Sequence, residues 1–279
     1  MQVFIAGCGT MGSGIIQTFA VTGHEVYMYD IKQEFVDRGY DRIDKQLKRQ
    51  VEKGRMTQEE ADASMARLHK TVQLDDARNA DLVLEAIFEE MSVKRELFGQ
   101  LDQICGPDCL FLSNTSSLSV TEMAHGYDHE SKFLGFHFFN PAPVMKLIEI
   151  IRGANTSDEA VEKAKEIATA IGKTPVLVHE SPGFVVNRIL IPMINEAIDL
   201  VDRGVASPED IDTAMQLGAN HPMGPLALGD LIGLDIVLNI MEVLYHETGD
   251  SKYRPSPLLK QMTRAGKLGR KTKQGFYKY

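Results

Sequence analysis

Short apolar runs of the length of buried strands recur through the first two thirds of the chain, with helix-forming segments between them. Most of these runs are apolar throughout, which is typical of parallel strands covered on both faces. The predicted strands are residues 2–7, 24–30, 81–87, 110–116, 133–141, 146–151 and 174–179. The clearest predicted helices between them are residues 11–22, 32–70 and 157–170. This alternation predicts an α/β fold with a doubly wound, mostly parallel sheet of the Rossmann type.

The pattern changes after about residue 180. Residues 184–203 are apolar at helical spacing and contain Pro192, which predicts a kink. Ser207 precedes a proline and two acids, a combination that favours a helix start. Residues 226–247 have the pattern of one long, largely apolar helix, and no strand pattern is convincing between 181 and 270. The last third of the chain is therefore predicted to be all-helical.

The chain is 279 residues long, which suits two domains of ordinary size. We expect an α/β domain over residues 1–180, with a helical excursion at about 32–70. We expect an all-helical C-terminal domain over residues 181–279.

Composition excludes several classes of protein. Thirty basic against 39 acidic residues give a net charge of −9, which argues against a general nucleic-acid binder. No apolar run reaches the roughly 18–20 residues that span a bilayer, and the N-terminus lacks a signal-peptide or transit pattern. Three cysteines do not suggest a disulfide framework. We therefore expect a cytoplasmic protein that binds neither nucleic acid nor membrane.

Two histidines, His125 and His129, have the spacing of helical metal ligands. They lie in a polar stretch without further ligand types at the right positions, so a solvated loop is the favoured interpretation. The sequence predicts no metal site.

A glycine pattern, Gly7-x-Gly9-x-x-Gly12, lies where the first strand turns into a helix. Such glycines allow a tight turn and close approach of a pyrophosphate to the helix N-terminus. Asp30 follows at the end of the second strand, where a carboxylate can accept hydrogen bonds from ribose hydroxyls and repel a 2′-phosphate. The pattern predicts NAD as cofactor, with NADP less favoured, although the charge of Lys32 would soften that bias.

His137 and Glu149 lie on two predicted strands that are otherwise apolar. A carboxylate in such a strand needs a partner, because burying an unpaired charge is costly. If the strands are neighbours, Glu149 can orient the imidazole and raise its basicity. Two alternatives stay open: His137 can be a hydrogen-bonded core residue, and Glu149 can face solvent at an edge.

Ser116 belongs to a hydroxyl-rich loop, residues 113–118, that follows a predicted strand. Ligands of α/β proteins bind at such loops, but a polar helix start would have the same composition. Asn187 is a polar residue on an apolar helix, and can be a substrate ligand or a satisfied core amide.

Several segments together resemble the 3-hydroxyacyl-CoA dehydrogenase family, most closely its short bacterial 3-hydroxybutyryl-CoA dehydrogenases. They are SNTSSL, HFFNP followed by MKLIEI, SPGFVVNR, HPMGPLALGD and GRKTKQGFYKY. They occur in order along essentially the whole chain, which makes them far more specific than the glycine pattern. The resemblance implies an oxidoreductase that interconverts (S)-3-hydroxybutyryl-CoA and acetoacetyl-CoA by hydride transfer with NAD.

The resemblance also implies roles for individual residues. The family's catalytic and substrate-contacting positions fall on His137, Glu149, Ser116 and Asn187. Its cofactor positions fall on Gly7, Gly9, Met11, Gly12, Asp30, Glu89, Lys94, Asn114, Ser116, Asn140 and Lys271. One departure is Lys273, where the family has a glycine, so the local geometry of the tail is in doubt.

Residues 38–55 carry seven basic and three acidic groups, a local charge of +4. CoA ends in a phosphorylated ADP, and the resemblance implies CoA contacts here, at Lys48, Arg49 and Lys53, as well as at Ser116. A solvated helix face is the alternative, and Gln46 stands where the family has a serine. The resemblance further implies a homodimer or higher homo-oligomer formed through the C-terminal helices.

Two other functions stay open on the sequence alone. One is a related dehydrogenase that acts on a free hydroxy acid or sugar acid. The other is a catalytically silent protein built on the same fold.

Overall fold

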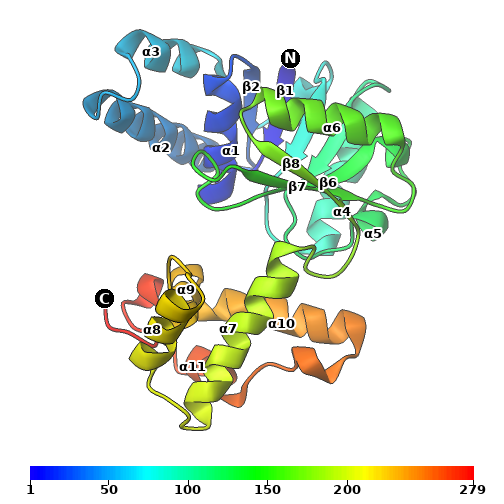
Figure 1. The fold of residues 1–279 in the computed structure, drawn as a ribbon. Coiled ribbons are helices and arrows are strands. Elements are labelled where there is room, and N and C mark those ends of the chain that lie inside the picture. The colour runs from blue at the N-terminus through cyan, green and yellow to red at the C-terminus, as the bar shows by residue number, and fades with distance from the viewer. The chain divides into compact units, whose positions relative to one another are not determined.

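A computed structural model describes residues 1–279, which form two compact units, Met1–Ser181 and Pro182–Tyr279 (Figure 1). The first unit is built of strands and helices, and the second contains helices without named strands. None of the helices is both long enough and apolar enough to cross a membrane.

The first unit contains an eight-stranded sheet with the order β3-β2-β1-β4-β5-β6-β7-β8. Its strands are β1 Gln2–Ala6, β2 Glu25–Tyr29, β3 Leu68–Thr71, β4 Leu82–Glu85, β5 Leu110–Ser113, β6 Phe133–Phe138, β7 Leu147–Arg152 and β8 Thr174–His179. All neighbours pair in parallel except β6 and β7, which are antiparallel. The predicted doubly wound, mostly parallel sheet is confirmed.

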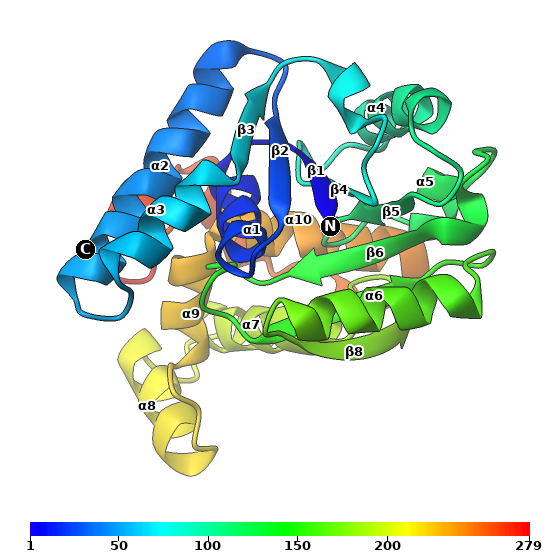
Figure 2. The ribbon, with the colours of Figure 1, turned by 90° about the horizontal axis from the view of Figure 1, so that it is seen from above.

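Helices cover both faces of this sheet (Figure 2). On one face, α1 (Thr10–Val21) and α6 (Asp158–Ala170) share a core with strand residues such as Leu84. On the other face, Phe98 of α4 (Met91–Ile104) packs against Phe111 and Phe133. Short helix α5 (Val120–Ala124) follows β5. Because successive strand side chains point to opposite faces, a strand buried on both sides is apolar throughout.

The parallel strands of this sheet end in register. Ala6 pairs with Tyr29 and with Glu85, which in turn pairs with Ser113. We call the edge where these strands end the carboxyl edge, and the opposite one the amino edge. Beyond Gly135, the last paired residue of β6 next to β5, the strand β6 continues past the end of β5.

The excursion after β2 holds α2 (Gln33–Glu52) and α3 (Gln58–Ala66), and α3 begins with a reciprocal capping box at Thr57. The prediction of helix up to residue 70 is wrong at its end, because residues 68–71 form β3 at the edge of the sheet. The first and last residues of β3 are buried and the two between them are more exposed, and the strand has only four residues. This gave too short a pattern to recognise.

The second unit packs its helices around one apolar core. They are α7 Val186–Asp202, α8 Pro208–Gly218, α9 Pro225–Ile232, α10 Leu234–Thr248 and α11 Pro257–Arg264. The prediction of a single helix over 226–247 is wrong. Gly233 has a φ of 107° and separates α9 from α10, because a right-handed helix cannot continue through that conformation.

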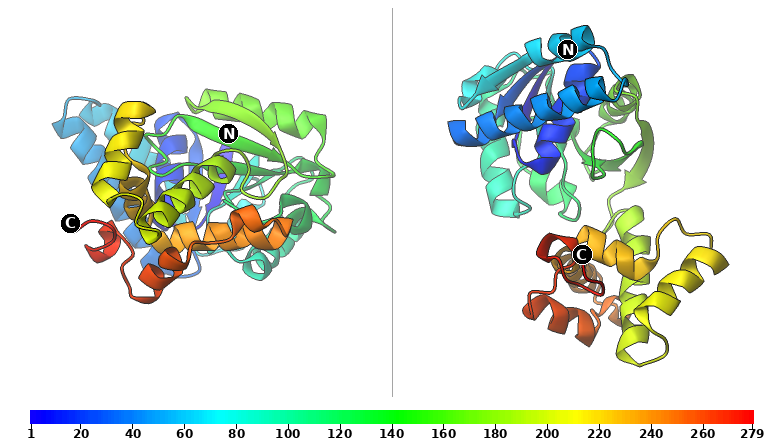
Figure 3. Two further views of the ribbon diagram at one scale, coloured as in Figure 1. Left: turned by 60° about the horizontal axis from the view of Figure 1, so that its bottom comes forward. Right: turned by 90° about the vertical axis from the view of Figure 1, so that its left-hand side faces the viewer.

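The C-terminal segment, red in Figure 3, is held onto α9 by Asp230. This buried carboxylate accepts hydrogen bonds from the backbone N–H groups of Phe276 and Tyr277 at 3.0 and 2.9 Å. Short 3₁₀ turns lie at Leu74–Ala77, Glu130–Lys132, Ser251–Tyr253 and Arg270–Thr272.

Candidate active site

The glycine loop between β1 and α1 is closely packed at two of its glycines and open at the third. Gly7 has a φ of 108°, and a Cβ there would lie 2.5 Å from the carbonyl oxygen of Ala86. A Cβ on Gly12 would lie 1.8 Å from the carbonyl oxygen of Gly7, whereas one on Gly9 would meet nothing within 4 Å. Because no side chain caps α1 at Gly9, its first N–H groups suit an anionic phosphate.

Asp30 stands beside this loop with its carboxylate fixed by the backbone. Its oxygens accept hydrogen bonds from the N–H groups of Cys8 and Ile31 at 2.9 and 2.8 Å. A carboxylate has about four acceptor positions, so Asp30 can still accept ribose hydroxyls. Asp30 also lines a cavity of about 460 Å³ together with Gly9, Arg38, Arg42 and Phe88, among others.

These residues fit the adenosine half of NAD. The glycine loop offers open backbone for a pyrophosphate, and Asp30 offers acceptors for a ribose. Arg38 and Arg42 line the same cavity. Their charges oppose that of Asp30 and weaken its repulsion of a 2′-phosphate, as Lys32 was expected to do.

His137 and Glu149 are directly opposite residues of the antiparallel pair β6–β7. Opposite residues of such a pair share one face, with their side chains within reach of each other. The Nδ1 of His137 lies 2.9 Å from Oε2 of Glu149, and the two residues are 6% and 1% exposed. Glu149 therefore does not face solvent at an edge, since β7 is paired on both sides.

The position of His137 in the sheet follows from the register. β6 runs parallel to β5, and His137 lies two residues beyond Gly135, at the carboxyl edge. The next residue, Phe138, donates its N–H to Oδ1 of Asn114 at 2.9 Å. The imidazole thus stands on a rigid strand that is tied to the loop following β5.

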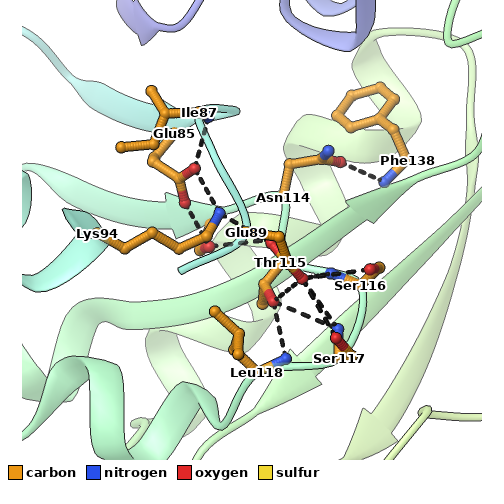
Figure 4. Close-up of polar contacts among 11 residues, drawn as sticks. Glu85, Ile87, Glu89, Lys94, Asn114, Thr115, Ser116, Ser117, Leu118 and Phe138 are labelled. Atoms are coloured by element: carbon orange, nitrogen blue, oxygen red, sulfur yellow. Dashed lines mark hydrogen bonds and ion pairs between the residues drawn. The ribbon is translucent and has the colours of Figure 1, made fainter. Parts of the chain in front are cut away.

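A buried ion-pair cluster lies at the ends of β4 and β5 (Figure 4). The Nζ of Lys94 lies 2.6 Å from Oε1 of Glu85 and 3.1 Å from Oε2 of Glu89. Glu85 and Lys94 are 0% and 1% exposed. Glu85 also accepts hydrogen bonds from Ile87 N and Ser113 Oγ, both at 2.7 Å. An ammonium group is thereby held between two carboxylates.

Glu89 connects this cluster to the hydroxyl-rich loop. Its Oε1 accepts hydrogen bonds from Thr115 Oγ1 and Ser116 N at 2.7 Å, and from Ser117 N at 3.2 Å. Burial by itself would raise the pKa of Glu89, but the Lys94 ammonium and these hydrogen bonds outweigh it and lower the pKa. The loop that carries Ser116 is therefore ordered around an ionised carboxylate.

Asn140 follows β6 and lines a second cavity, of about 230 Å³, with Arg42 and Gln46 of α2. The loop after Asn140 is held by Lys173, whose Nζ donates to the carbonyl oxygens of Ala142 and Met145 at 2.6 and 2.8 Å. Lys173 is 7% exposed. Its contacts indicate that the wall of this cavity is fixed rather than free to move.

The remaining predicted residues of the first unit lie on helices. Lys48 and Arg49 are exposed on α2, with Lys48 paired to Asp44 at 2.7 Å, and Lys53 is exposed at the end of that helix. Met11, in the first turn of α1, packs against the core.

Two predicted residues, Asn187 and Lys271, belong to the second unit. Asn187 lies in the first turn of α7. Lys271 pairs with Asp235 of α10 at 2.5 Å. Lys273 has a φ of 59°, a left-handed conformation that favours glycine. This explains in physical terms the glycine that the resemblance led us to expect there.

The interpretation of His129 as part of a solvated loop is wrong. His129 is 3% exposed, its Nδ1 lies 2.6 Å from Oδ1 of Asp102, and its Nε2 lies 2.9 Å from the carbonyl oxygen of Gly106. His125 has an exposed side chain. The burial of His129 depends on a carboxylate 27 residues away, which the local sequence did not reveal.

Sequence reasoning also missed Glu85 and Lys173. Glu85 interrupts an apolar strand as Glu149 does, so the argument that led to Glu149 could have found it. Lys173 offers no such signal, because it lies in the short connection between α6 and β8, where a polar residue is expected.

Comparisons with known proteins cover both units. The family described as "3-hydroxyacyl-CoA dehydrogenase, NAD binding domain" matches residues 2–181, and "3-hydroxyacyl-CoA dehydrogenase, C-terminal domain" matches residues 183–279. The chain is 51% identical over 279 residues to the 3-hydroxybutyryl-CoA dehydrogenase of Clostridioides difficile, covering 100% of this chain and 99% of that one.

Two further relatives are similar over almost their whole length. A probable 3-hydroxybutyryl-CoA dehydrogenase of Bacillus subtilis is 52% identical over 278 residues, with 100% of this chain and 97% of the relative covered. The crystal structure of (S)-3-hydroxybutyryl-CoA dehydrogenase from Ralstonia eutropha superposes with a TM-score of 0.97 at 47% identity, covering 100% of this chain and 98% of that one.

Proposed function

Because the chain belongs to the 3-hydroxyacyl-CoA dehydrogenase family, we propose that it interconverts (S)-3-hydroxybutyryl-CoA and acetoacetyl-CoA, with NAD as the hydride carrier. Family membership implies an acyl-CoA substrate. The names of the similar proteins from C. difficile and R. eutropha support a short acyl chain.

The observation that carries the proposal is the His137–Glu149 pair at the carboxyl edge of the sheet. Ligands of open α/β sheets bind outside this edge. A histidine there, oriented by a buried carboxylate, is equipped to exchange a proton with a substrate hydroxyl. The cavity beside Asp30, at the same edge, suits the adenosine half of a dinucleotide.

In the proposed mechanism, NAD supplies the hydride acceptor. With Nδ1–H donated to Glu149, neutral His137 has its base at Nε2 and takes the proton of the 3-hydroxyl group there. The carboxylate of Glu149 then stabilises the imidazolium. In the reductive direction, the same ring begins protonated and returns the proton to the carbonyl oxygen.

Other residues would bind and orient. We assign Ser116 and Asn187 to the substrate oxygen, and Lys48, Arg49 and Lys53 to the phosphates of CoA. The cofactor positions are the glycine loop with Met11, and Asp30, Glu89, Lys94, Asn114, Asn140 and Lys271. For Lys94, buried between two carboxylates, the contacts favour an indirect role in which it holds Glu89.

The direct test is the loss of NADH absorbance when acetoacetyl-CoA is added. Turnover with acetoacetyl-CoA but not with free acetoacetate supports the proposal. Equal turnover with both would favour a dehydrogenase of free hydroxy acids. No turnover with either, in a protein that binds NADH, would favour the catalytically silent alternative.

We also propose that the protein is a homodimer or higher homo-oligomer formed through its C-terminal unit. Helix α8 lies at the margin of that unit (Figure 3), and Leu217 on it is 83% exposed. Val205, Leu231 and Ile236 of the same unit are also exposed, and an interface would cover apolar surface of this kind. The mass in solution tests this. A cytoplasmic location stays a prediction of the sequence.

A further inference from the structure

Lys94 of α4 forms ion pairs with both Glu85, at the end of β4, and Glu89, in the loop that follows β4. Two carboxylates and one ammonium give the cluster a net charge of −1. Glu85 accepts three hydrogen bonds, from Lys94, Ile87 N and Ser113, as an ionised carboxylate can. The excess negative charge is a built feature of this edge and not a surface accident, since two of the three groups are buried.

The position of the cluster relates it to one half of the dinucleotide. The strand order reverses between β1 and β4, and dinucleotides bind across such a switch point. Asp30 and the glycine loop lie on the β1–β2 side and suit the adenosine half. The cluster lies on the β4–β5 side, which is left for the nicotinamide half.

The two redox forms of the cofactor differ in charge at that half. The oxidised nicotinamide ring carries one positive charge and the reduced ring carries none, while the rest of the molecule is the same. A fixed negative charge near the ring therefore stabilises one form and leaves the other nearly unaffected.

We propose that the excess negative charge of the Glu85–Lys94–Glu89 cluster strengthens the binding of oxidised NAD relative to that of NADH. Removing this charge should therefore lower the affinity for NAD more than the affinity for NADH. This rests on the proposed function. Bound cofactor is thereby poised toward the oxidised form, which favours hydride donation to the ketoacyl substrate. Glu85, to which the sequence analysis gave no role, thereby helps to determine which redox form of the cofactor the protein binds more tightly.

The magnitude follows from Coulomb's law. For a separation of about 10 Å and an effective dielectric constant between about 20 and 40, one unit charge changes the affinity for a cation by about four- to fifteenfold. Purely structural damage would weaken both redox forms alike and leave their ratio unchanged.

The test is a charge ladder read by equilibrium binding without substrate. The dissociation constant of NADH is measured by its fluorescence, and that of NAD by competition. Glu85→Gln and Glu89→Gln, made separately, each bring the cluster to zero charge, and Lys94→Met brings it to −2. Glu96→Gln, an exposed position on the same helix α4, is the matched control.

Both glutamine variants are expected to weaken the binding of NAD, relative to that of NADH, by about four- to fifteenfold. Lys94→Met is expected to shift the ratio of the two dissociation constants in the opposite direction. Glu96→Gln should leave the ratio unchanged. If Glu85→Gln fails to fold, Glu89→Gln still tests the proposal, because the side chain of Glu89 is 35% exposed and its replacement disturbs the core less. Shifts of the same sign in all three variants, or a constant ratio, would overturn the proposal. Wild-type protein that binds neither form would instead refute the proposed function.

Discussion

Two buried histidine–carboxylate pairs lie at opposite edges of the same sheet. At the carboxyl edge, His137 Nδ1 lies 2.9 Å from Glu149, and at the amino edge, His129 Nδ1 lies 2.6 Å from Asp102. All four residues are less than a tenth exposed. Distance and burial alone would not tell which pair is catalytic.

The surroundings separate the two pairs. The Nε2 of His129 is engaged by the carbonyl oxygen of Gly106, and its ring is stacked on Phe111 with centroids 4.3 Å apart. Both nitrogens of this ring are thus tied to protein acceptors. His137, whose ring lies near that of Phe139 with centroids 4.5 Å apart, precedes the residue that Asn114 holds and lies at the edge that carries the glycine loop and the cavity beside Asp30. The edge of the sheet, more than the pair, indicates chemistry.

The largest expected effect is at His137. His137→Gln should lower kcat for acetoacetyl-CoA by about 10²–10⁴-fold, because glutamine cannot exchange a proton. The dissociation constant of NADH should change little, since the imidazole is proposed to act on the substrate oxygen. Stopped-flow kinetics and NADH fluorescence measure the two quantities. Near-normal turnover would show that the His137–Glu149 pair is no more catalytic than the His129–Asp102 pair.

The matching variant at the amino edge should affect stability and leave catalysis intact. His129→Leu removes the imidazole partner of the buried carboxylate of Asp102, which keeps the backbone N–H groups of residues 128 and 129 as donors, and should cost about 1–3 kcal/mol of unfolding free energy. Urea denaturation measures the loss, and turnover per folded molecule should stay at the wild-type value. A fall in kcat as large as that of His137→Gln would show that the amino edge takes part in the reaction.

A carboxylate at the carboxyl edge, Asp30, can be compared in the same way with a carboxylate outside the site. Asp30→Ala should weaken NAD binding by about ten- to a hundredfold, as expected for hydrogen bonds to a charged group, and should narrow the preference for NAD over NADP. Isothermal titration with both cofactors measures this. Asp37→Ala is the control, because Asp37 is a half-exposed carboxylate whose partner is Lys70 on β3. An unchanged NAD/NADP ratio at Asp30 would contradict its assigned role.

The fold was largely predictable because a doubly covered parallel strand must be apolar throughout, whatever it packs against. β3 escaped because it is four residues long and half-exposed. The break between α9 and α10 escaped because it depends on the φ of a single glycine, Gly233. The local pattern of apolar and polar residues does not predict a backbone conformation that depends on tertiary packing.

The candidate site divides in the same way. Asp30 and His137 could be proposed from the sequence because each stands at the end of a strand or in a recognisable motif. The partners that order the site, Glu85 with Lys94 and Lys173 with its two carbonyls, are defined by contacts across the fold. His129 was misinterpreted for that reason, since its partner Asp102 lies on helix α4, 27 residues away in the sequence.

The smallest expected effect concerns the cysteines at the two edges. Burial, with the nearby charge of Asp30, raises the pKa of the Cys8 thiol in the glycine loop to about 12. At the amino edge, a hydrogen bond from Cys109 lowers the pKa of Cys105 below the ordinary thiol value of 9.0. Since the thiolate is the nucleophile, iodoacetamide should label Cys105 first, at a pH where Cys8 is still protonated.

Labelling at Cys105 should leave turnover unchanged, because the amino edge holds structure and not chemistry. Mass spectrometry of the labelled protein identifies the site, and Cys105→Ser should remove the fast label without changing NADH affinity. Rapid labelling of Cys8 accompanied by loss of NADH binding would show that the glycine loop is more open than its packing against Tyr29 indicates. In that case the carboxyl edge would be less rigid than the amino edge, and His137 would not stand on a rigidly held part of the sheet.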